Sequence, residues 1–203
     1  MKKSNYNFVS KNRRPIEDKR FVTGQGNFVA DIDRPGMLHV AILACHEPSA
    51  AIDKIDFSAA LKIKGVIDVI TGKELAAATK PLMNGLDTPN VKRYPLAFEK
   101  VRYAGEWVCA IVAKSRATAE DASERIVLKT KSLKFVLDSE EALLSKSPIV
   151  HESHGSNILL EKKFVWGDVV EDFKKSDHQI SYNVNWGRNS TVPVETFGVV
   201  AEW

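Results

Sequence analysis

The chain has 203 residues, which is enough for one large domain or two small ones with a hydrophobic core. Hydrophobic residues make up 44% and charged residues 27%, as in ordinary globular proteins, and the 29 basic and 26 acidic side chains nearly balance. Scattered Lys and Arg give no footprint for nucleic acid, and no run of about 18 apolar residues offers a membrane span, so we expect neither partner.

Residues 1–17 are polar and basic, and we interpret them as an N-terminal arm that is either disordered or laid across a partner. Pro15 favours an extended path for the residue before it. The arm lacks the apolar stretch of a secretory signal, so the expected location is the cytoplasm.

Strand patterns begin at Phe21. The glycines of Gly24-Gln25-Gly26 favour a tight turn. Over residues 28–32 we expect a half-buried strand, in which Phe28, Ala30 and Ile32 alternate with Asn27, Val29, Asp31 and Asp33. After a turn at 34–36, Met37–Ala44 is a nearly continuous apolar run, which predicts a strand covered on both faces. A further extended segment holds Ile52, Ile55 and Phe57.

Helix signals begin at Ser58, which we expect to cap a short helix that Gly65 ends. Val66–Ile70 predicts the next strand. Thr71 is followed three residues later by Glu74, the capping-box pattern that opens a second short helix.

Residues 79–99 contain three prolines and one glycine, and we expect them to form a long surface loop. Val101–Val112 is another strand region, broken by Gly105. Ser115 caps the clearest helix of the chain, in which apolar and charged side chains mix at helical spacing through Val127.

A returning strand is expected over 128–137, and Asp138 or Ser139 caps a short helix that runs to Leu144. Residues 145–157 are rich in Ser, His and Pro and are the best candidate for a domain boundary. Beyond them we expect a strand over 158–165, a helix after the turn Gly167-Asp168, a strand over 179–184 and an extended segment over 191–203.

This order of strands and short helices predicts an α+β (mixed α/β) fold. Because the sequence ends within an apolar strand pattern, we expect an incomplete domain. Its missing strands would come from another polypeptide or from further residues.

The two cysteines, Cys45 and Cys109, each lie in an apolar run, so we favour buried reduced thiols over a disulfide. Two thiols are too few for an iron–sulfur cluster, which usually takes four. The four tryptophans are too dispersed for a stacking platform and are expected to anchor the core or an interface. They are Trp107, Trp166, Trp186 and Trp203.

His151 and His154 flank a carboxylate, and on a helix two imidazoles at this spacing could share one face as metal ligands. A nearby proline and Gly155 argue against a helix, so exposed loop histidines are the favoured interpretation and a metal site is the alternative. Asp177 and His178 are the other candidate ligands in this half of the chain.

Glu106 follows a glycine in an apolar strand pattern, and a buried carboxylate needs a partner. We expect an ion pair with Arg102, and we keep a general acid or base as the alternative. For Glu195 we favour a structural carboxylate, which pairs with a buried Arg or accepts backbone N–H bonds, over one that faces a substrate cavity. Gly24-Gln25-Gly26 lacks the third glycine and the helix of a dinucleotide-binding loop, so a turn is favoured there.

Four fragments stand in one order along the chain: Arg20-Phe21-Val22-Thr23-Gly24-Gln25-Gly26, Pro35-Gly36-Met37-Leu38-His39, Lys100-Val101-Arg102-Tyr103-Ala104-Gly105-Glu106 and Pro193-Val194-Glu195. Together they resemble the opening of the large subunit of molybdenum hydroxylases, the family of xanthine dehydrogenase, aldehyde oxidase and aerobic carbon monoxide dehydrogenase. The resemblance runs from about Arg14 to the end of the sequence.

The resemblance implies an α/β hammerhead domain over residues 18–137, a linker over 138–157 and the incomplete start of the first molybdopterin-binding domain over 158–203. It implies part of an oxidoreductase that acts on an aldehyde, an N-heterocycle or CO, with water as the oxygen source. The family's pterin-contacting glycine-rich segment, active-site glutamine and catalytic glutamate have no counterparts here. We therefore expect no catalytic, cofactor-binding or metal residue on this chain.

For the complete enzyme the resemblance implies a molybdenum–pterin cofactor, with FAD and 2Fe-2S clusters on partner domains or subunits. The implied partners are the remaining molybdenum-binding portion of the large subunit and the iron–sulfur and flavin subunits. We expect the lone chain to be an inactive scaffold. The alternative is a non-catalytic binding or assembly module of the same fold, or a degenerate remnant.

Overall fold

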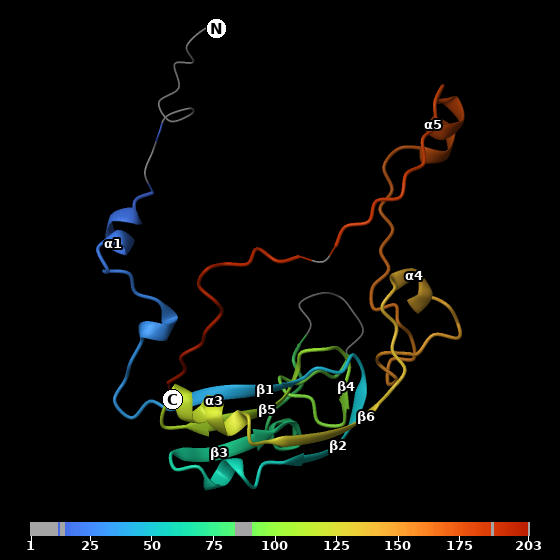
Figure 1. Cartoon of the computed structure of the whole chain (residues 1–203). Helices are drawn as coiled ribbons and strands as arrows, with labels where there is room; N and C mark the ends of the chain where they lie inside the picture. Colours follow the sequence, from blue (N-terminus) through green and yellow to red (C-terminus); the bar gives the residue numbers. More distant parts are fainter. Residues whose placement is uncertain (1–11, 13–14, 84–90, 188, 203) are drawn as a thin grey trace. The chain divides into compact units, whose positions relative to one another are not determined.

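The computed structural model describes residues 12, 15–83, 91–187 and 189–202. It divides into two compact units: Gly36–Gln179, and a second unit made of the segments before Gly36 and after Gln179. All the strands assigned among the described residues lie in the first unit, in two small antiparallel sheets (Figure 1). The strands are β1 (His39–Cys45), β2 (Ala50–Asp56), β3 (Val66–Thr71), β4 (Lys100–Val101), β5 (Glu106–Ala113) and β6 (Val127–Ser132).

Short helices connect and flank these strands. None of the helices within the described ranges is long and apolar enough to cross a membrane. The α-helices are α1 (Asp18–Val22), α2 (Gly72–Ala78), α3 (Arg116–Ser123), α4 (Ser139–Ala142) and α5 (Val169–Lys175), and the 3-10 helices are η1 (Val29–Asp31) and η2 (Ala60–Lys62).

The central strand of the first sheet is β5, which pairs with β1 on one side and β3 on the other. Cys109 of β5 stands opposite Leu43 and Thr71, and Ile111 stands opposite Ala41 and Val69. Cys109 and Ile111 are fully buried because both ladders and the core cover this strand. The second sheet has the order β4-β2-β6.

One hydrophobic core joins both sheets. The first sheet contributes Val69, Cys109 and Ile111, and the second contributes Val101 with Leu128 packed against it. Helix α3 lies against β1 and β5 (Figure 1) and turns two fully buried alanines, Ala119 and Ala122, toward them. Alanine at these positions lets the helix backbone approach the sheet closely.

The predicted helix caps at Thr71 and Ser115 are confirmed. Thr71 accepts the N–H of Glu74 on its hydroxyl, while the Glu74 carboxylate accepts the N–H of Thr71 at 2.8 Å. Ser115 Oγ accepts the N–H of Thr118 at 3.2 Å and caps α3.

Two further caps follow the predicted order of elements. Asp138 accepts the N–H of Glu141 at 2.8 Å at the start of α4, and Asp168 accepts that of Glu171 at 3.1 Å at the start of α5. Each cap satisfies one N–H that the first turn of a helix leaves without a partner.

The strand predicted for residues 28–32 is wrong, because this stretch contains the 3-10 helix η1. The Asp31 carboxylate accepts the N–H of Phe28 at 3.0 Å and closes the turn locally. Phe21, where strand patterns were expected to begin, lies in α1. Ser58 does not cap a helix either, since its hydroxyl donates to Asp56 and η2 begins at Ala60.

The strands predicted for 158–165 and 179–184 are absent from the described residues, and no strand is assigned in the described part of 191–203. Apolar alternation needs a neighbouring strand to pair with before it becomes a strand, and no strand ladder includes these stretches among the residues described. The helix predicted to run to Val127 ends at Ser123, and Val127 begins β6.

The surface loop predicted for 79–99 is partly wrong. Val91, Leu96 and Ala97 are buried, and the N–H of Ala97 donates to the C=O of Trp107 at 2.7 Å. The predicted coverage of β1 on both faces is also wrong, since Val40 is 59% exposed. Residues 84–90 of this loop, and the parts of the predicted N-terminal arm at 1–11 and 13–14, lie outside the described residues.

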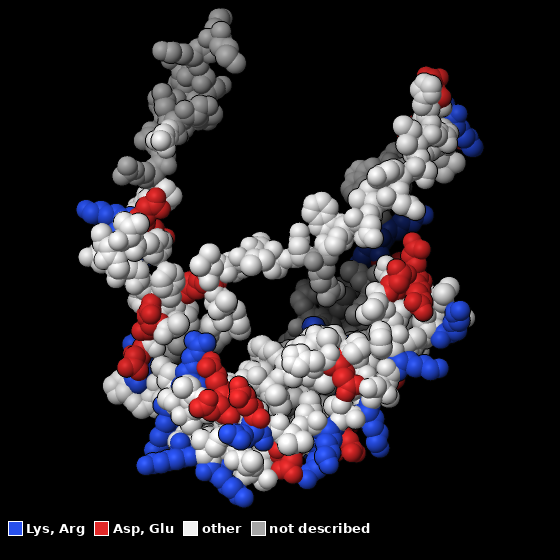
Figure 2. All heavy atoms as spheres, in the orientation of Figure 1, with Lys and Arg blue, Asp and Glu red and all other residues white. Residues whose placement is uncertain are grey.

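Charged side chains of both signs are interspersed on the face shown in Figure 2. The described ion pairs join neighbouring residues on exposed surfaces, except the pair between Lys100 and Glu152. Exposed pairs of this kind contribute little to stability.

Among the described glycines, Gly72 has the least room for a side chain. A Cβ atom added there would lie 2.2 Å from the carbonyl oxygen of Ala97. We expect Gly72→Ala to lower the free energy of unfolding by about 3 kcal/mol or more, since overpacking against backbone cannot be relieved by a rotamer change. Urea unfolding of the chain measures this. Gly187→Ala is the control, since no heavy atom lies within 4 Å of its added Cβ. Equal effects of the two substitutions would contradict the prediction.

Candidate functional site

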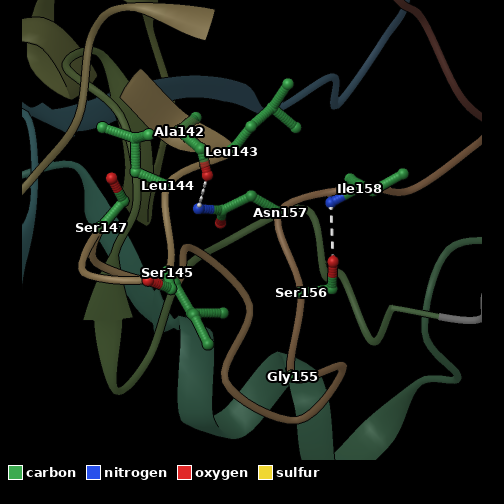
Figure 3. A pocket seen from close by; sticks show the side chains of 10 residues that line it. Ala142, Leu143, Leu144, Ser145, Ser147, Gly155, Ser156, Asn157 and Ile158 are labelled. Carbon is green, nitrogen blue, oxygen red and sulfur yellow. Dashed lines mark hydrogen bonds between the residues drawn. The ribbon is translucent and has the colours of Figure 1, made fainter. Parts of the chain in front are cut away.

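A hollow of about 190 Å³ lies beside α4 (Figure 3). Its polar groups are serine hydroxyls and the amide of Asn157, and its lining includes no titratable side chain. Such a lining can form hydrogen bonds, but it supplies neither an acid nor a base nor a strong metal ligand.

Asn157 uses both ends of its amide to hold the surrounding chain. Nδ2 donates to the carbonyl oxygens of Ala142 and Pro148, each at 3.0 Å, and Oδ1 accepts the N–H of Val150 at 2.9 Å. The bond to Ala142 is visible in Figure 3. Because these three bonds occupy the amide, Asn157 is a structural residue of the hollow.

The second candidate is a charged cluster around His151. Of its other members, Lys100 lies in β4, Arg102 follows β4 and Glu106 begins β5. Lys100 forms an ion pair with Glu152 and is only 16% exposed. This pair ties the turn at His151 to the second sheet across 52 positions of sequence. The full cluster is Arg93, Lys100, Arg102, Glu106, His151 and Glu152.

Arg102 is held in this cluster through its backbone and its guanidinium. Its N–H donates to Glu106 Oε2 at 2.5 Å, and Nη1 donates to the carbonyl oxygen of Lys100 at 3.3 Å. Nε is buried and has no hydrogen-bond partner among the residues described. The Arg102 charge therefore lies close to His151 without a carboxylate bonded to it in this part of the structure.

The pKa of His151 is lowered, first by burial and then by the positive charges of Arg102 and Arg93. Lys100 acts in the same direction, while Glu152 opposes it. The neutral imidazole is therefore favoured at neutral pH.

Burial raises the pKa of Glu106, while the N–H and the charge of Arg102 oppose the rise. The predicted side-chain ion pair is corrected: the carboxylate bonds the backbone N–H of Arg102 rather than its guanidinium. A raised pKa is suitable for a general acid. However, Glu106 does not line the hollow.

The predicted histidines lie in a turn, as the flanking residues indicated. Both are half-buried rather than exposed, and Nε2 of His154 lies 3.0 Å from the carbonyl oxygen of Ile158. Within the described residues, His151, His154, Asp177 and His178 do not form a group of three or more His, Cys, Asp or Glu side chains that could hold a metal ion.

Glu195 is a structural carboxylate, as favoured. Its Oε1 accepts the N–H of Val29 at 2.9 Å. Gly24 has φ +70°, which fits the turn expected there. Trp166 and Trp186 are 77% and 79% exposed, so the core interpretation is wrong for them, and Trp203 lies outside the described residues.

Both cysteines are free and buried, as predicted. Burial raises the pKa of the Cys109 thiol to about 11. The thiolate is the nucleophilic form, so this cysteine is poorly suited to covalent chemistry.

Sequence reasoning missed Lys100, Asn157 and Glu47. The Glu47 carboxylate accepts the hydroxyls of Thr130 and Ser132, more than 80 positions away. No short-range spacing could have indicated these contacts, because each partner is brought in by strand pairing or by a loop.

The comparisons with known proteins agree with one another. Residues 23–134 match the family model described as "Aldehyde oxidase and xanthine dehydrogenase, a/b hammerhead domain". The chain is 32% identical over 200 residues to the nicotine 6-hydroxylase large subunit of Paenarthrobacter nicotinovorans, covering 97% of this chain and 24% of that protein. It is also 32% identical over 204 residues to the carbon monoxide dehydrogenase large chain of Hydrogenophaga pseudoflava, covering 92% and 25%.

Solved structures show the same likeness. Quinoline 2-oxidoreductase from Pseudomonas putida 86 superposes with a TM-score of 0.71 at 30% identity, over 80% of this chain and 21% of that one. The aldehyde oxidoreductase from Desulfovibrio gigas gives 0.67 at 28% identity, over 78% and 18%. The chain thus spans about a quarter of the length of the curated relatives named above.

Glu106 and Glu74 should affect stability with opposite dependence on pH. The pKa of Glu106 is raised above 4.5, so its contribution is present at low pH and is lost as pH rises from 4.5 through the raised value. The pKa of Glu74 is lowered by its bonds with Thr71, so its contribution is present above 4.5 and is lost as pH falls.

Urea unfolding of wild type, Glu106→Gln and Glu74→Gln over the acid range tests this. The free energy of unfolding of the wild type minus that of Glu106→Gln should fall as pH rises. The same difference taken against Glu74→Gln should increase as pH rises. Slopes of the same sign would contradict the pKa directions.

Both thiols should be unreactive in the folded chain. Iodoacetamide at mildly alkaline pH should leave Cys45 and Cys109 unmodified, because both are buried and the Cys109 thiolate is scarce. In urea both should react. Mass spectrometry counts the added groups, and rapid labelling of either thiol without denaturant would show that the core is not closed.

Proposed function

Because the chain belongs to the aldehyde oxidase and xanthine dehydrogenase family, with residues 23–134 matching its α/β hammerhead domain, we propose that it is the N-terminal scaffold part of a molybdenum hydroxylase large subunit. In this proposal the chain is inactive alone. It packs on the remaining molybdenum-binding portion and helps to build the subunit interface.

The observation that carries the proposal is the exposure of large apolar side chains after residue 157. Apolar groups of this size rarely stay in water unless a partner covers them. Phe164 stacks on Trp166 at 5.9 Å between ring centroids, and both remain largely exposed. The most exposed side chains of this stretch include Phe164, Trp166, Ile180, Tyr182, Trp186, Val194 and Phe197.

The donor groups of the described residues do not fit a pterin-bound metal centre. Both thiols are buried in the core, and the hollow beside α4 offers hydroxyls and an amide only. Among the residues that the structure describes, no three or more His, Cys, Asp or Glu side chains lie together as a possible metal site. We therefore derive no reaction step on this chain and assign no catalytic or cofactor-binding residue to it.

The proposal places the reaction in the complete assembly. There, a molybdenum–pterin centre would oxidise an aldehyde, an N-heterocycle or CO with water as the oxygen source. FAD and 2Fe-2S clusters on partner domains or subunits would accept the electrons. We further propose a cytoplasmic location and the arrangement of domains inferred from the sequence, with the hammerhead at 18–137, a linker at 138–157 and the start of a molybdopterin-binding domain at 158–203.

Metal and pterin content tests the proposal. The purified chain should carry no stoichiometric molybdenum by plasma mass spectrometry and no pterin by fluorescence after oxidation. Co-expression with the product of the downstream reading frame should yield a complex that contains both. Stoichiometric molybdenum on the lone chain would overturn the proposal.

A matched pair of variants tests the docking surface in the same co-expression. Trp166→Asp should reduce recovery of the complex, because it removes an exposed apolar anchor. Lys146→Glu changes an exposed charge outside the apolar stretch and should not. Failure of the wild type to bind the downstream product would favour a stand-alone binding module instead.

A further inference from the structure

The segment before strand β1 is a self-packed hook, defined here as residues 15–35. The rings of Phe21 and Phe28 stack at 5.8 Å between centroids with 15° between their planes. They close over Gly26, where an added Cβ would lie 3.0 Å from the Phe21 ring. Gly24, at φ +70°, supplies the turn between them. The hook is thus a preformed shape rather than a solvated arm.

The hook meets the C-terminal segment, residues 193–198, through a hydrogen bond. Glu195 Oε1 accepts the N–H of Val29 at 2.9 Å, across 166 positions of sequence. The neighbouring N–H of Phe28 donates to Asp31 Oδ2 at 3.0 Å. Two carboxylates therefore satisfy the backbone N–H groups at the start of η1, one from within the hook and one from the far end of the chain.

A close approach adds a second contact. A Cβ added to Gly198 would lie 2.8 Å from Cγ1 and 3.3 Å from Cβ of Val29. Only glycine lets the two backbones come this near without displacing the Val29 side chain. The hydrogen bond from Val29 to Glu195 and the close approach of Gly198 are separate observations, and both involve Val29.

We propose that the hook binds residues 193–198 of the same chain and that Glu195 is the residue that positions it. The hook then packs with the C-terminal segment, although its residues 23–35 lie within the stretch that matches the hammerhead model. Residues 36–179 are inserted between the two halves of one discontinuous unit, in agreement with the grouping of the segments before Gly36 and after Gln179. This inference does not depend on the molybdenum proposal, because it concerns contacts within this chain alone.

A designed disulfide tests the docking. The separation of 3.3 Å between the added Cβ of Gly198 and Cβ of Val29 is close to the range of about 3.5–4.5 Å that disulfides need. The full chain carrying Val29→Cys and Gly198→Cys should cross-link under mild oxidation and run faster on a non-reducing gel. Val29→Cys with Gly187→Cys is the control pair, since nothing lies within 4 Å of the Cβ added at Gly187.

The expected result is that the 29–198 pair cross-links several times faster than the 29–187 pair. Equal rates would overturn the proposal. Continued protection of Cys45 and Cys109 from alkylation shows that the core of each variant is folded.

The role of Glu195 is tested without any added cysteine. Hydrogen exchange at the Val29 amide should become faster in Glu195→Ala, which removes the acceptor. Glu195→Gln keeps an acceptor oxygen and should retain most of the protection. Glu202→Ala removes an exposed carboxylate from the same part of the chain and should match the wild type. If Glu195→Ala leaves the exchange of Val29 unchanged, Glu195 does not position the hook.

Discussion

The fold depends on one strand, β5, whose side chains are buried or partly buried along most of its length. Strand β5 must pair on both edges and be covered, because residues 108–111 carry apolar side chains that are all buried. Pairing with β1 and β3 satisfies its backbone, and α3 covers one side of the sheet with alanines. The neighbouring features follow from this strand: Gly105 turns the chain into it at φ +90°, and Ala97 bonds its second residue.

A cluster of charged side chains lies near the first residue of this strand. Glu106, its first residue, is stabilised by backbone N–H groups, and the side chains of Lys100 and Arg102 surround His151 nearby. Within this cluster Lys100 pairs with Glu152, and the Glu106 carboxylate accepts the N–H of Arg102. The hollow beside α4 has no titratable side chain in its lining. Such an arrangement suits a structural junction between a sheet and a following segment better than a reaction centre. It agrees with the scaffold role proposed for the chain.

Exposed apolar side chains distinguish the two parts of the sequence. Before residue 138, most apolar runs lie in strands that pair with each other. After residue 157, similar runs have no strand partner among the described residues. The same alternation of side chains therefore gives a strand in one place and an irregular extended chain in the other. The difference lies in the availability of a neighbouring ladder and not in the local pattern.

The amino-acid sequence by itself determined the features that act within a few residues. Thr71 and Glu74 cap α2, Ser115 caps α3, Gly105 allows the turn before β5, and the fragments around the glycines identify the family. The energy of a cap or a left-handed turn is decided locally, so the residue types suffice to predict it.

Only the tertiary structure decided which distant groups meet. Lys100 reaches Glu152 across 52 positions, and Glu195 reaches Val29 across 166. It also decided that the apolar pattern at 28–32 is a 3-10 turn and that the pattern at 158–165 is not a strand. A hydrogen bond or a strand ladder forms only where the backbone brings a partner to within about 3 Å, and side-chain periodicity carries no information about that partner.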